Sequence, residues 1–128
     1  MSSYKPEGYN SVSPYLIVTG AEKMINLLIE VFGGVPTRRF NTPEGKIMHA
    51  EVKIQDSIVM ISEASAQYPQ NNTLLHVYVE NSDETYQRAL AFGCEDQGAP
   101  KTAEGDSDKR GMFKDFAGNL WAVSTQQS

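Results

Sequence analysis

The chain carries one pattern twice, and this repeat limits its possible folds more than any other feature. Ser13–Gly33 and Leu74–Gly93 each combine a short apolar strand, a sharp turn and an amphipathic helix that ends in Phe-Gly. When Val18 is aligned with Val79, the two copies differ in length by one residue within the helix. Self-similarity at a period of about 61 residues, the offset between these valines, predicts two copies of one supersecondary unit.

Each copy continues into strand-rich sequence, and the closing segments IVMIS (58–62) and LWAVS (120–124) also correspond. Apolar residues at 3.6-residue spacing predict a helix from about Gly20 to Gly33 and another from Asn81 to Gly93. Alternating apolar residues and turn signals predict strands, over 12–18, 35–40, 47–54, 58–62, 74–79, 94–97, 110–113 and 120–124. The expected fold class is α+β, with two βαβββ modules that curl into a cup and helices outside. We expect one domain over residues 1–128, built of repeats 12–62 and 74–124.

Local signals predict how these elements begin and end. Thr19 with Glu22, and Asn81 with Glu84, have the spacing of capping boxes at the two helix starts. Asp115 precedes a glycine-containing turn and is expected to accept hydrogen bonds from its backbone. The polar segments are expected to form loops: 1–11 lying loosely on the surface, 63–73 linking the halves, and 100–109, whose acidic part 104–108 is expected to be solvated.

Composition excludes several functional classes. The 128 residues carry a formal charge of -5, and their eleven Lys and Arg residues are scattered, which argues against a nucleic-acid partner. No apolar run approaches the roughly 20 residues of a membrane span, and no apolar signal core opens the chain. The single cysteine, Cys94, follows a predicted helix end and is expected to be a buried small hydrophobe. A cytoplasmic location is therefore expected.

The sheet faces opposite the predicted helices would line the cup. Trp121 falls on the helix side and is expected in the core. A concave, mostly apolar surface with a few polar groups suits a small ligand. Alternation assigns these residues to the lining: Ser13, Tyr15, Ile17, His49, Glu51, Met60, Leu74, His76, Tyr78, Leu120 and Ala122.

The repeat resembles a known superfamily, that of the glyoxalases, bleomycin resistance proteins and extradiol dioxygenases, also called vicinal oxygen chelate proteins. The resemblance covers most of the chain, through the segments SPYLIVTGAEKMINLLIEVFGG, KIMHAEVKIQDSIVMIS, LHVYVENSD and FKDFAGNLW. KIMHAE, LHVYVE and the closing D-x-x-G-N-x-W are most similar to its PhnB-like branch. The resemblance implies paired βαβββ modules and a homodimer.

The resemblance also implies a divalent metal, held by one residue from the first and one from the last strand of each half. Those positions are occupied by Ser13, Met60, Leu74 and Ala122. None of these residues offers the imidazole, carboxylate or thiolate that divalent metals prefer. We therefore expect no metal and no cofactor at these positions, with a divalent metal as the alternative.

These residues are compatible with two functions. A third possibility is a structural or regulatory dimer in which the cup is vestigial. The first is a small-molecule-binding protein, as in drug-sequestering relatives, whose ligand contacts Tyr15, Met60, His76 and Tyr78. The second is a lyase, isomerase or dioxygenase-type enzyme that uses His49, Glu51 and His76 as a displaced metal site or as acid and base. Alternatively, each histidine is simply hydrogen-bonded to a backbone carbonyl or a tyrosine.

Overall fold

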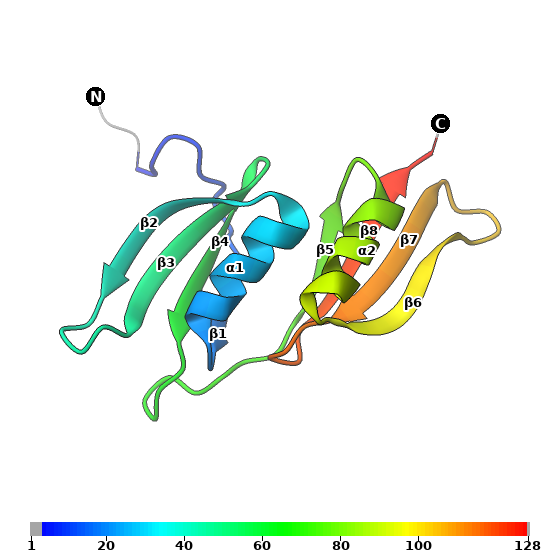
Figure 1. Ribbon diagram of the computed structural model, residues 1–128. Helices are drawn as coiled ribbons and strands as arrows, with labels where there is room; N and C mark the ends of the chain where they lie inside the picture. Colours follow the sequence, from blue (N-terminus) through cyan, green and yellow to red (C-terminus); the bar gives the residue numbers. More distant parts are fainter. Residues whose placement is uncertain (1–3, 128) are drawn as a thin grey trace. The chain divides into compact units, whose positions relative to one another are not determined.

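The fold is described by a computed structural model that covers residues 4–127. The expected order, strand–helix–three strands repeated twice, is confirmed (Figure 1). The elements are β1 (Tyr15–Val18), α1 (Ala21–Phe32), β2 (Val35–Asn41), β3 (Ile47–Ile54), β4 (Ser57–Glu63), β5 (Leu74–Tyr78), α2 (Ser82–Phe92), β6 (Glu95–Thr102), β7 (Asp108–Lys114) and β8 (Leu120–Gln126).

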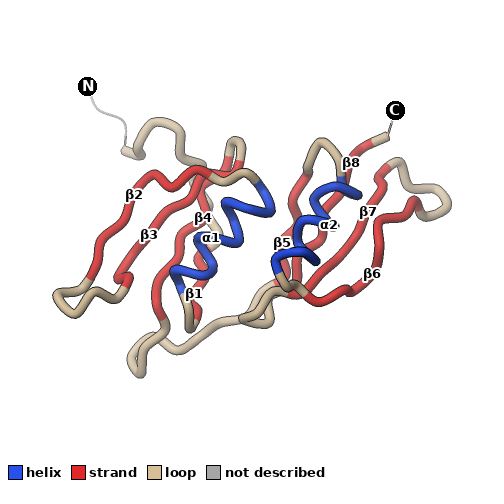
Figure 2. The backbone as a smooth tube through the Cα atoms, in the orientation of Figure 1, coloured by secondary structure: helices blue, strands red, loops and turns tan. Residues whose placement is uncertain are grey.

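The chain divides into two compact units, each with one four-stranded mixed sheet. The first unit contains the residues up to Ile29 and Gly33–Asn71, and the second contains Glu30–Phe32 and the chain from Asn72 onward. The strand orders are β1-β4-β3-β2 and β5-β8-β7-β6, and in each sheet the first pair is parallel and the other two are antiparallel. Both sheets are curled and neither closes (Figure 1). Figure 2 shows the loop between β4 and β5 that joins the units.

The apolar stripe of α1 is buried, as its 3.6-residue spacing predicts. Met24, Leu27 and Leu28 have no exposed surface, and neither do Leu16 and Val18 on the helix-facing side of β1. The other residues of β1 therefore point to the opposite face of the sheet. This alternation separates a packed apolar face from the open face that carries the polar candidates.

The two helices are capped by different means, and the capping box predicted from Thr19 and Glu22 is wrong. The N-cap of α1 is Gly20, which has a left-handed φ of 101° and makes no side-chain cap. The Glu63 carboxylate accepts hydrogen bonds from the backbone N–H groups of Gly20 and Ala21, at 3.0 and 2.9 Å. In α2 the predicted cap is confirmed, since Asn81 Oδ1 accepts from the backbone N–H of Glu84 at 3.1 Å.

In the second unit, α2 contacts β6, β7 and β8. Trp121 is fully buried, and Cys94 is buried too, as predicted. The predicted role of Asp115 is confirmed, since its carboxylate accepts from the backbone N–H groups of Ala117 and Asn119, each at 2.9 Å. It also accepts from the side chains of Asn119 at 3.2 Å and Trp121 at 2.9 Å. One buried carboxylate thus ties the β7–β8 turn to the core.

Predicted boundaries are wrong in two segments. The first strand begins at Tyr15 rather than near Val12, whose side chain is 85% exposed. The segment predicted as a loop from 100 to 109 begins and ends in strands, because β6 extends through Thr102 and β7 begins at Asp108. The residues of β6 are almost all exposed, so no apolar alternation marks this edge strand. Its backbone pairing with β7 holds it in place.

Candidate ligand-binding site

The open face of the first sheet gathers residues that the sequence assigns to the cup. Strand pairing places Tyr15 beside Met60, and Met60 beside Glu51. It also places Phe40 on β2, which the sequence analysis did not assign to the cup, beside His49 on β3. Because paired residues of neighbouring strands point to the same face, these five side chains share the face opposite Leu16 and Val18.

Three of these side chains form a continuous polar chain. The Tyr15 hydroxyl lies 3.0 Å from His49 Nδ1, and His49 Nε2 lies 2.7 Å from Glu51 Oε2. The rings of Tyr15 and His49 pack with their centroids 5.6 Å apart. The structure therefore brings together the two predicted acid–base candidates of this unit and joins them to a predicted ligand-binding tyrosine.

Glu51 is the buried end of this polar chain, with only 2% of its surface exposed. The Tyr9 hydroxyl donates a hydrogen bond to Glu51 Oε1, and Arg38 Nε lies 3.9 Å from the same oxygen. Burial by itself would raise the pKa of the Glu51 carboxyl. The hydrogen bonds from Tyr9 and His49, with the charge of Arg38, outweigh burial and leave this pKa lowered. Glu51 is therefore a carboxylate at neutral pH.

Part of the N-terminal segment is anchored, and the expectation that residues 1–11 lie loosely is wrong for Tyr9 and Asn10. Besides the bond from Tyr9 to Glu51, Asn10 Nδ2 donates to Ser57 Oγ at 3.3 Å. Arg38 stacks over the Tyr9 ring, 5.8 Å from its centroid. The same bond that lowers the pKa of Glu51 raises the pKa of the Tyr9 hydroxyl. Residues 1–3 of this segment lie outside the described residues.

A pocket of about 740 Å³ opens beside this polar chain, within the first unit. Tyr15 belongs to both, since it lines the pocket and its hydroxyl contacts His49. Met48 and Tyr68, which are 57% and 61% exposed, offer apolar surface at the pocket. The lining consists of Tyr15, Ile17, Thr42, Lys46, Ile47, Met48, Ser62, Glu63, Ala64, Ser65, Gln67 and Tyr68.

The inter-unit loop forms one wall of the pocket because its side chains bind the free edge of β1. Asn71 Oδ1 accepts from the backbone N–H of Ile17, and Asn71 Nδ2 donates to the carbonyl of Tyr15, both at 3.0 Å. Gln70 Oε1 accepts from the backbone N–H of Thr19 at 2.9 Å. These bonds replace the missing neighbouring strand, so the edge is covered and the loop is held against the first unit.

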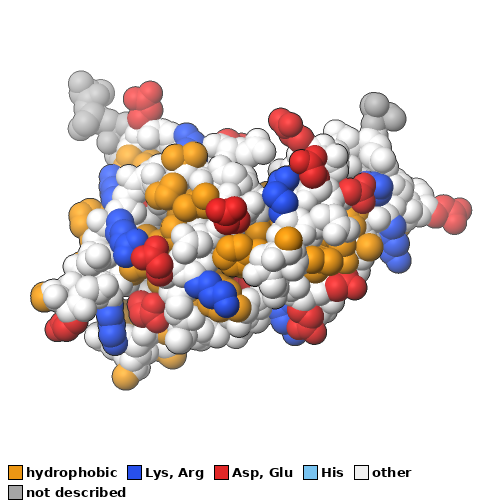
Figure 3. Space-filling model, viewed as in Figure 1, with side chains coloured by type: hydrophobic (Ala, Val, Ile, Leu, Met, Phe, Trp, Pro, Cys, Tyr) orange, Lys and Arg blue, Asp and Glu red, His pale blue; other side chains and the backbone are white. Residues whose placement is uncertain are grey.

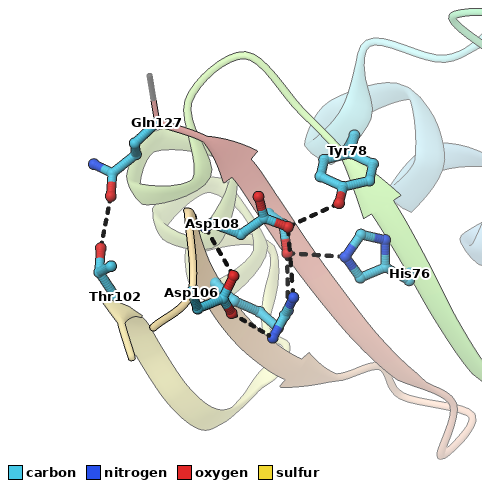
Figure 4. A network of polar contacts seen from close by, with 8 residues as sticks. His76, Tyr78, Thr102, Asp106, Asp108 and Gln127 are labelled. Carbon is cyan, nitrogen blue, oxygen red and sulfur yellow. Dashed lines mark hydrogen bonds and ion pairs between the residues drawn. The ribbon is translucent and has the colours of Figure 1, made fainter. Parts of the chain in front are cut away.

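The second unit has its own polar network (Figure 4). His76 Nε2 lies 2.9 Å from Ser124 Oγ, and this hydroxyl oxygen accepts from Arg110 Nε at 3.0 Å. The Tyr78 hydroxyl donates to Asp108 Oδ2 at 2.7 Å, and Arg110 lies 3.6 Å from the same oxygen. The bond to Asp108 raises the pKa of Tyr78. The prediction that residues 104–108 form a solvated loop is thus wrong at Asp108, which is 6% exposed.

The positions implied for a metal do not form a fitting donor set. Ser13 lies before β1, and Met60 lies beside Tyr15 rather than beside Ser13. Leu74 pairs with Leu120, while Ala122 pairs with His76. One hydroxyl, one thioether and two hydrocarbon side chains do not offset the lost hydration of a divalent cation. Within each unit, the described residues contain no group of three His, Cys, Asp or Glu side chains able to hold a metal.

The residues predicted to form a displaced metal site, His49, Glu51 and His76, belong to different units. His49 and Glu51 are adjacent in the first, whereas His76 contacts Ser124 and Tyr78 in the second. Both ring nitrogens of His49 already have partners, so a metal would have to displace Tyr15 or Glu51.

Several site residues escaped the sequence analysis. Arg38 could have been found, because it precedes Phe40 by two residues in a predicted strand and so shares its face. Arg110 likewise starts a predicted strand. Tyr9, Asp108 and Tyr68 carry no such signal, since each lies in or next to a polar segment without periodicity.

Figure 3 shows Lys and Arg side chains interspersed with Asp and Glu over the drawn face. Among residues 4–127, no helix is both long and apolar enough to cross a membrane.

Comparisons with known proteins agree with this architecture. A family model described as the glyoxalase/bleomycin resistance protein/dioxygenase superfamily matches residues 9–123. The uncharacterized proteins Mb0911c of Mycobacterium bovis and Rv0887c of Mycobacterium tuberculosis are each 27% identical to the chain over 127 residues. These matches cover 88% of the chain in both cases, and 81% and 72% of the respective relatives.

Solved structures with the same fold include three from different bacteria. Protein PA1353 from Pseudomonas aeruginosa has a TM-score of 0.75 and 24% identity, covering 93% of this chain and 99% of its own. TnmS3, described as an antibiotic binding protein from Streptomyces sp. CB03234, has a TM-score of 0.70 and 15% identity, covering 99% and 100%. The fosfomycin resistance protein FosX from Listeria monocytogenes has a TM-score of 0.66 and 17% identity, covering 92% and 93%. At these identities the likeness shows the fold alone.

Proposed function

The chain belongs to the glyoxalase/bleomycin resistance protein/dioxygenase superfamily, and on this premise we propose that it is a small-molecule-binding protein. The observation that carries the proposal is the pocket of about 740 Å³ on the first unit, with Tyr15 joining it to the His49–Glu51 pair. Its volume lies within the range of pockets that hold small organic ligands. Two proteins with the same fold, TnmS3 and FosX, are described as an antibiotic binding and a fosfomycin resistance protein, which supports a small-molecule ligand.

The lining indicates the character of the ligand. Ile17, Met48 and Tyr68 would contact an apolar or aromatic body, while Tyr15 would hold a polar group. Met60 lies beside Tyr15 on the same face, which supports its predicted place in the ligand site. The motifs KIMHAE and LHVYVE favour the PhnB-like branch of the superfamily, which we propose as the subgroup.

The open face of the second unit is proposed as a further contact surface. Leu74 and Tyr78 are 59% and 60% exposed there, although both belong to a sheet face. Exposed apolar groups on a sheet and the unpaired outer edges of β2 and β6 favour association. We propose that two copies form a homodimer and that His76 and Tyr78 contribute to ligand binding in it.

The proposal can be tested with the fluorescent probe anilinonaphthalene sulfonate, which reports binding to apolar pockets. We expect saturable binding to the wild type, weakened roughly tenfold by Ile17→Glu, because a carboxylate would be desolvated in the pocket. Tyr68→Ala should weaken binding by removing an aromatic wall. Val12→Glu, at an exposed residue outside the pocket, is the matched control. Unchanged binding by Ile17→Glu would contradict the proposed site.

The contact of 2.7 Å between His49 and Glu51 favours one second candidate, an enzyme that uses this pair for acid–base or metal-assisted chemistry. Metal analysis of protein purified without added metal separates it from the binding protein. Under the binding-protein proposal, neither His49→Ala nor His76→Ala changes the metal content. A stoichiometric zinc, nickel, manganese or iron ion that either variant loses would favour the enzyme.

A further inference from the structure

The hydrogen bonds of the polar chain beside the pocket run in one direction. This direction determines whether the Tyr15 hydroxyl donates to a ligand or accepts from it. We infer that the Tyr15 hydroxyl faces the pocket as a hydrogen-bond acceptor and selects aromatic ligands that carry an O–H or N–H donor. This inference rests on the proposed function, because it names the ligand class of the same pocket. It depends on the order of donors and acceptors along Glu51, His49 and Tyr15.

The direction starts at Glu51. An ionised carboxylate can only accept hydrogen bonds. Its Oε1 accepts from Tyr9 and lies near Arg38, and its Oε2 is in contact with His49 Nε2. The lowered pKa of Glu51 agrees with an ionised carboxylate in this position. His49 Nε2 must therefore carry the hydrogen of their shared bond.

The second step follows from the chemistry of imidazole. A neutral imidazole carries one ring hydrogen, so a protonated Nε2 leaves Nδ1 as an acceptor. We assign His49 this neutral form, in which Arg38, 3.9 Å from Glu51 Oε1, is the positive charge beside the carboxylate. The Tyr15 hydroxyl, 3.0 Å from Nδ1, must then donate its single hydrogen to His49.

Tyr15 consequently has lone pairs but no hydrogen left for a ligand. Tyr15 is 40% exposed and lines the pocket, so a molecule bound there lies against its side chain. The carboxylate of Glu63, which also lines the pocket, already accepts from the N–H groups of Gly20 and Ala21. Phenols, aromatic amines and other aromatic molecules with a donor group match this arrangement, and ethers of the same shape do not.

Nitrogen NMR of the protein with isotopically labelled histidine tests the first part directly. The chain has two histidines, and a His76→Gln variant assigns their signals. We expect His49 to be the neutral tautomer protonated at Nε2 at neutral pH. A tautomer protonated at Nδ1, or an imidazolium, would overturn the inference, whether or not any ligand binds.

A matched pair of probes, β-naphthol and its methyl ether, tests the selection. We expect the naphthol to bind roughly tenfold more tightly, because a polar atom left without its hydrogen bond in a partly buried site costs about this factor. Tyr15→Phe should abolish the difference, whereas Tyr4→Phe, at a residue that is 91% exposed, should retain it. Equal affinities in the wild type would overturn the inference. Failure of both probes to bind would count against the proposed pocket, and the tautomer would still decide the direction of the chain.

Discussion

At the scale of single residues, each unit contains a buried carboxylate surrounded by donors. Glu51 receives hydrogen bonds from Tyr9 and His49, and Asp115 accepts from the turn that it begins. The two are 2% and 4% exposed. Neither carboxylate is solvated, so its hydrogen bonds within the protein replace those that water would make.

The lowered pKa of Glu51 predicts a pH dependence of stability. Because the folded pKa lies below the ordinary 4.5, Glu51 stabilises the fold above that pH, and this contribution is lost as the pH falls through the folded pKa. We expect the urea midpoint to fall between about pH 6 and about pH 3, and to fall less in Glu51→Gln, which cannot titrate. An identical pH dependence in both proteins would contradict this role.

Removing the carboxylate of Asp115 should be strongly destabilising. Asp115→Ala leaves the buried N–H groups of Ala117, Asn119 and Trp121 without their acceptor, so we expect a loss of about 3 kcal/mol or more in the free energy of unfolding. The fluorescence of Trp121, the only tryptophan in the chain, reports unfolding in urea. Asp56→Ala, at an exposed turn, is the control and should change stability by no more than about 0.5 kcal/mol.

At the scale of elements, the two helices begin alike in sequence but are stabilised differently. The cap of α2 is local, because Asn81 directly precedes the helix. The cap of α1 comes from the end of β4, where Glu63 binds two backbone N–H groups. A carboxylate at a helix N-terminus also interacts favourably with the helix dipole. Since Glu63 lines the pocket, the start of α1 and the pocket wall share one side chain.

Two substitutions compare these caps. We expect Glu63→Ala to cost about 1–2 kcal/mol, because it removes two hydrogen bonds and a charge at the helix start. Asn81→Ala should cost about 1 kcal/mol, the usual value for a lost local cap. Urea unfolding of both variants measures the difference. A Glu63→Ala variant as stable as the wild type would show that water replaces this cap fully.

At the scale of the whole molecule, each unit has one packed face and one open face on its sheet. The packed faces carry fully buried residues such as Leu16 and Trp121. The open face of the second unit carries the exposed Leu74 and Tyr78, and that of the first carries the half-exposed Phe40. The free edge of β1 is already covered by Gln70 and Asn71, so association through this edge is disfavoured. The open faces are the better candidates for the contact between copies.

The proposed homodimer predicts a mass of about twice the 14.2 kDa of one chain by light scattering at micromolar concentration. Leu74→Glu should shift the protein toward the monomer, because a charge would be desolvated in the contact. Val12→Glu introduces the same charge outside the sheets and should leave the mass unchanged. A wild-type protein that is monomeric under these conditions would contradict the proposal.

The sequence by itself determined the repeated order of elements, the two faces of each sheet and the cap at Asn81. It also placed His49 and Glu51 on one face, because residues two apart in a strand always point the same way. These features depend on short-range periodicity and on side chains near their partners along the chain. The edge strand β6 was only partly predictable, because its exposed residues show no alternation.

Only the tertiary structure decided what completes the candidate site. Tyr9 meets Glu51 across 42 residues, and Glu63 meets Gly20 across 43. Tyr78 meets Asp108 across 30, from a segment whose composition resembles a solvated loop. Tyr68 reaches the pocket because the loop around Gln70 and Asn71 binds the edge of β1. Such contacts join segments that are far apart in the sequence, and the local spacing of residue types does not reveal which distant segments will meet.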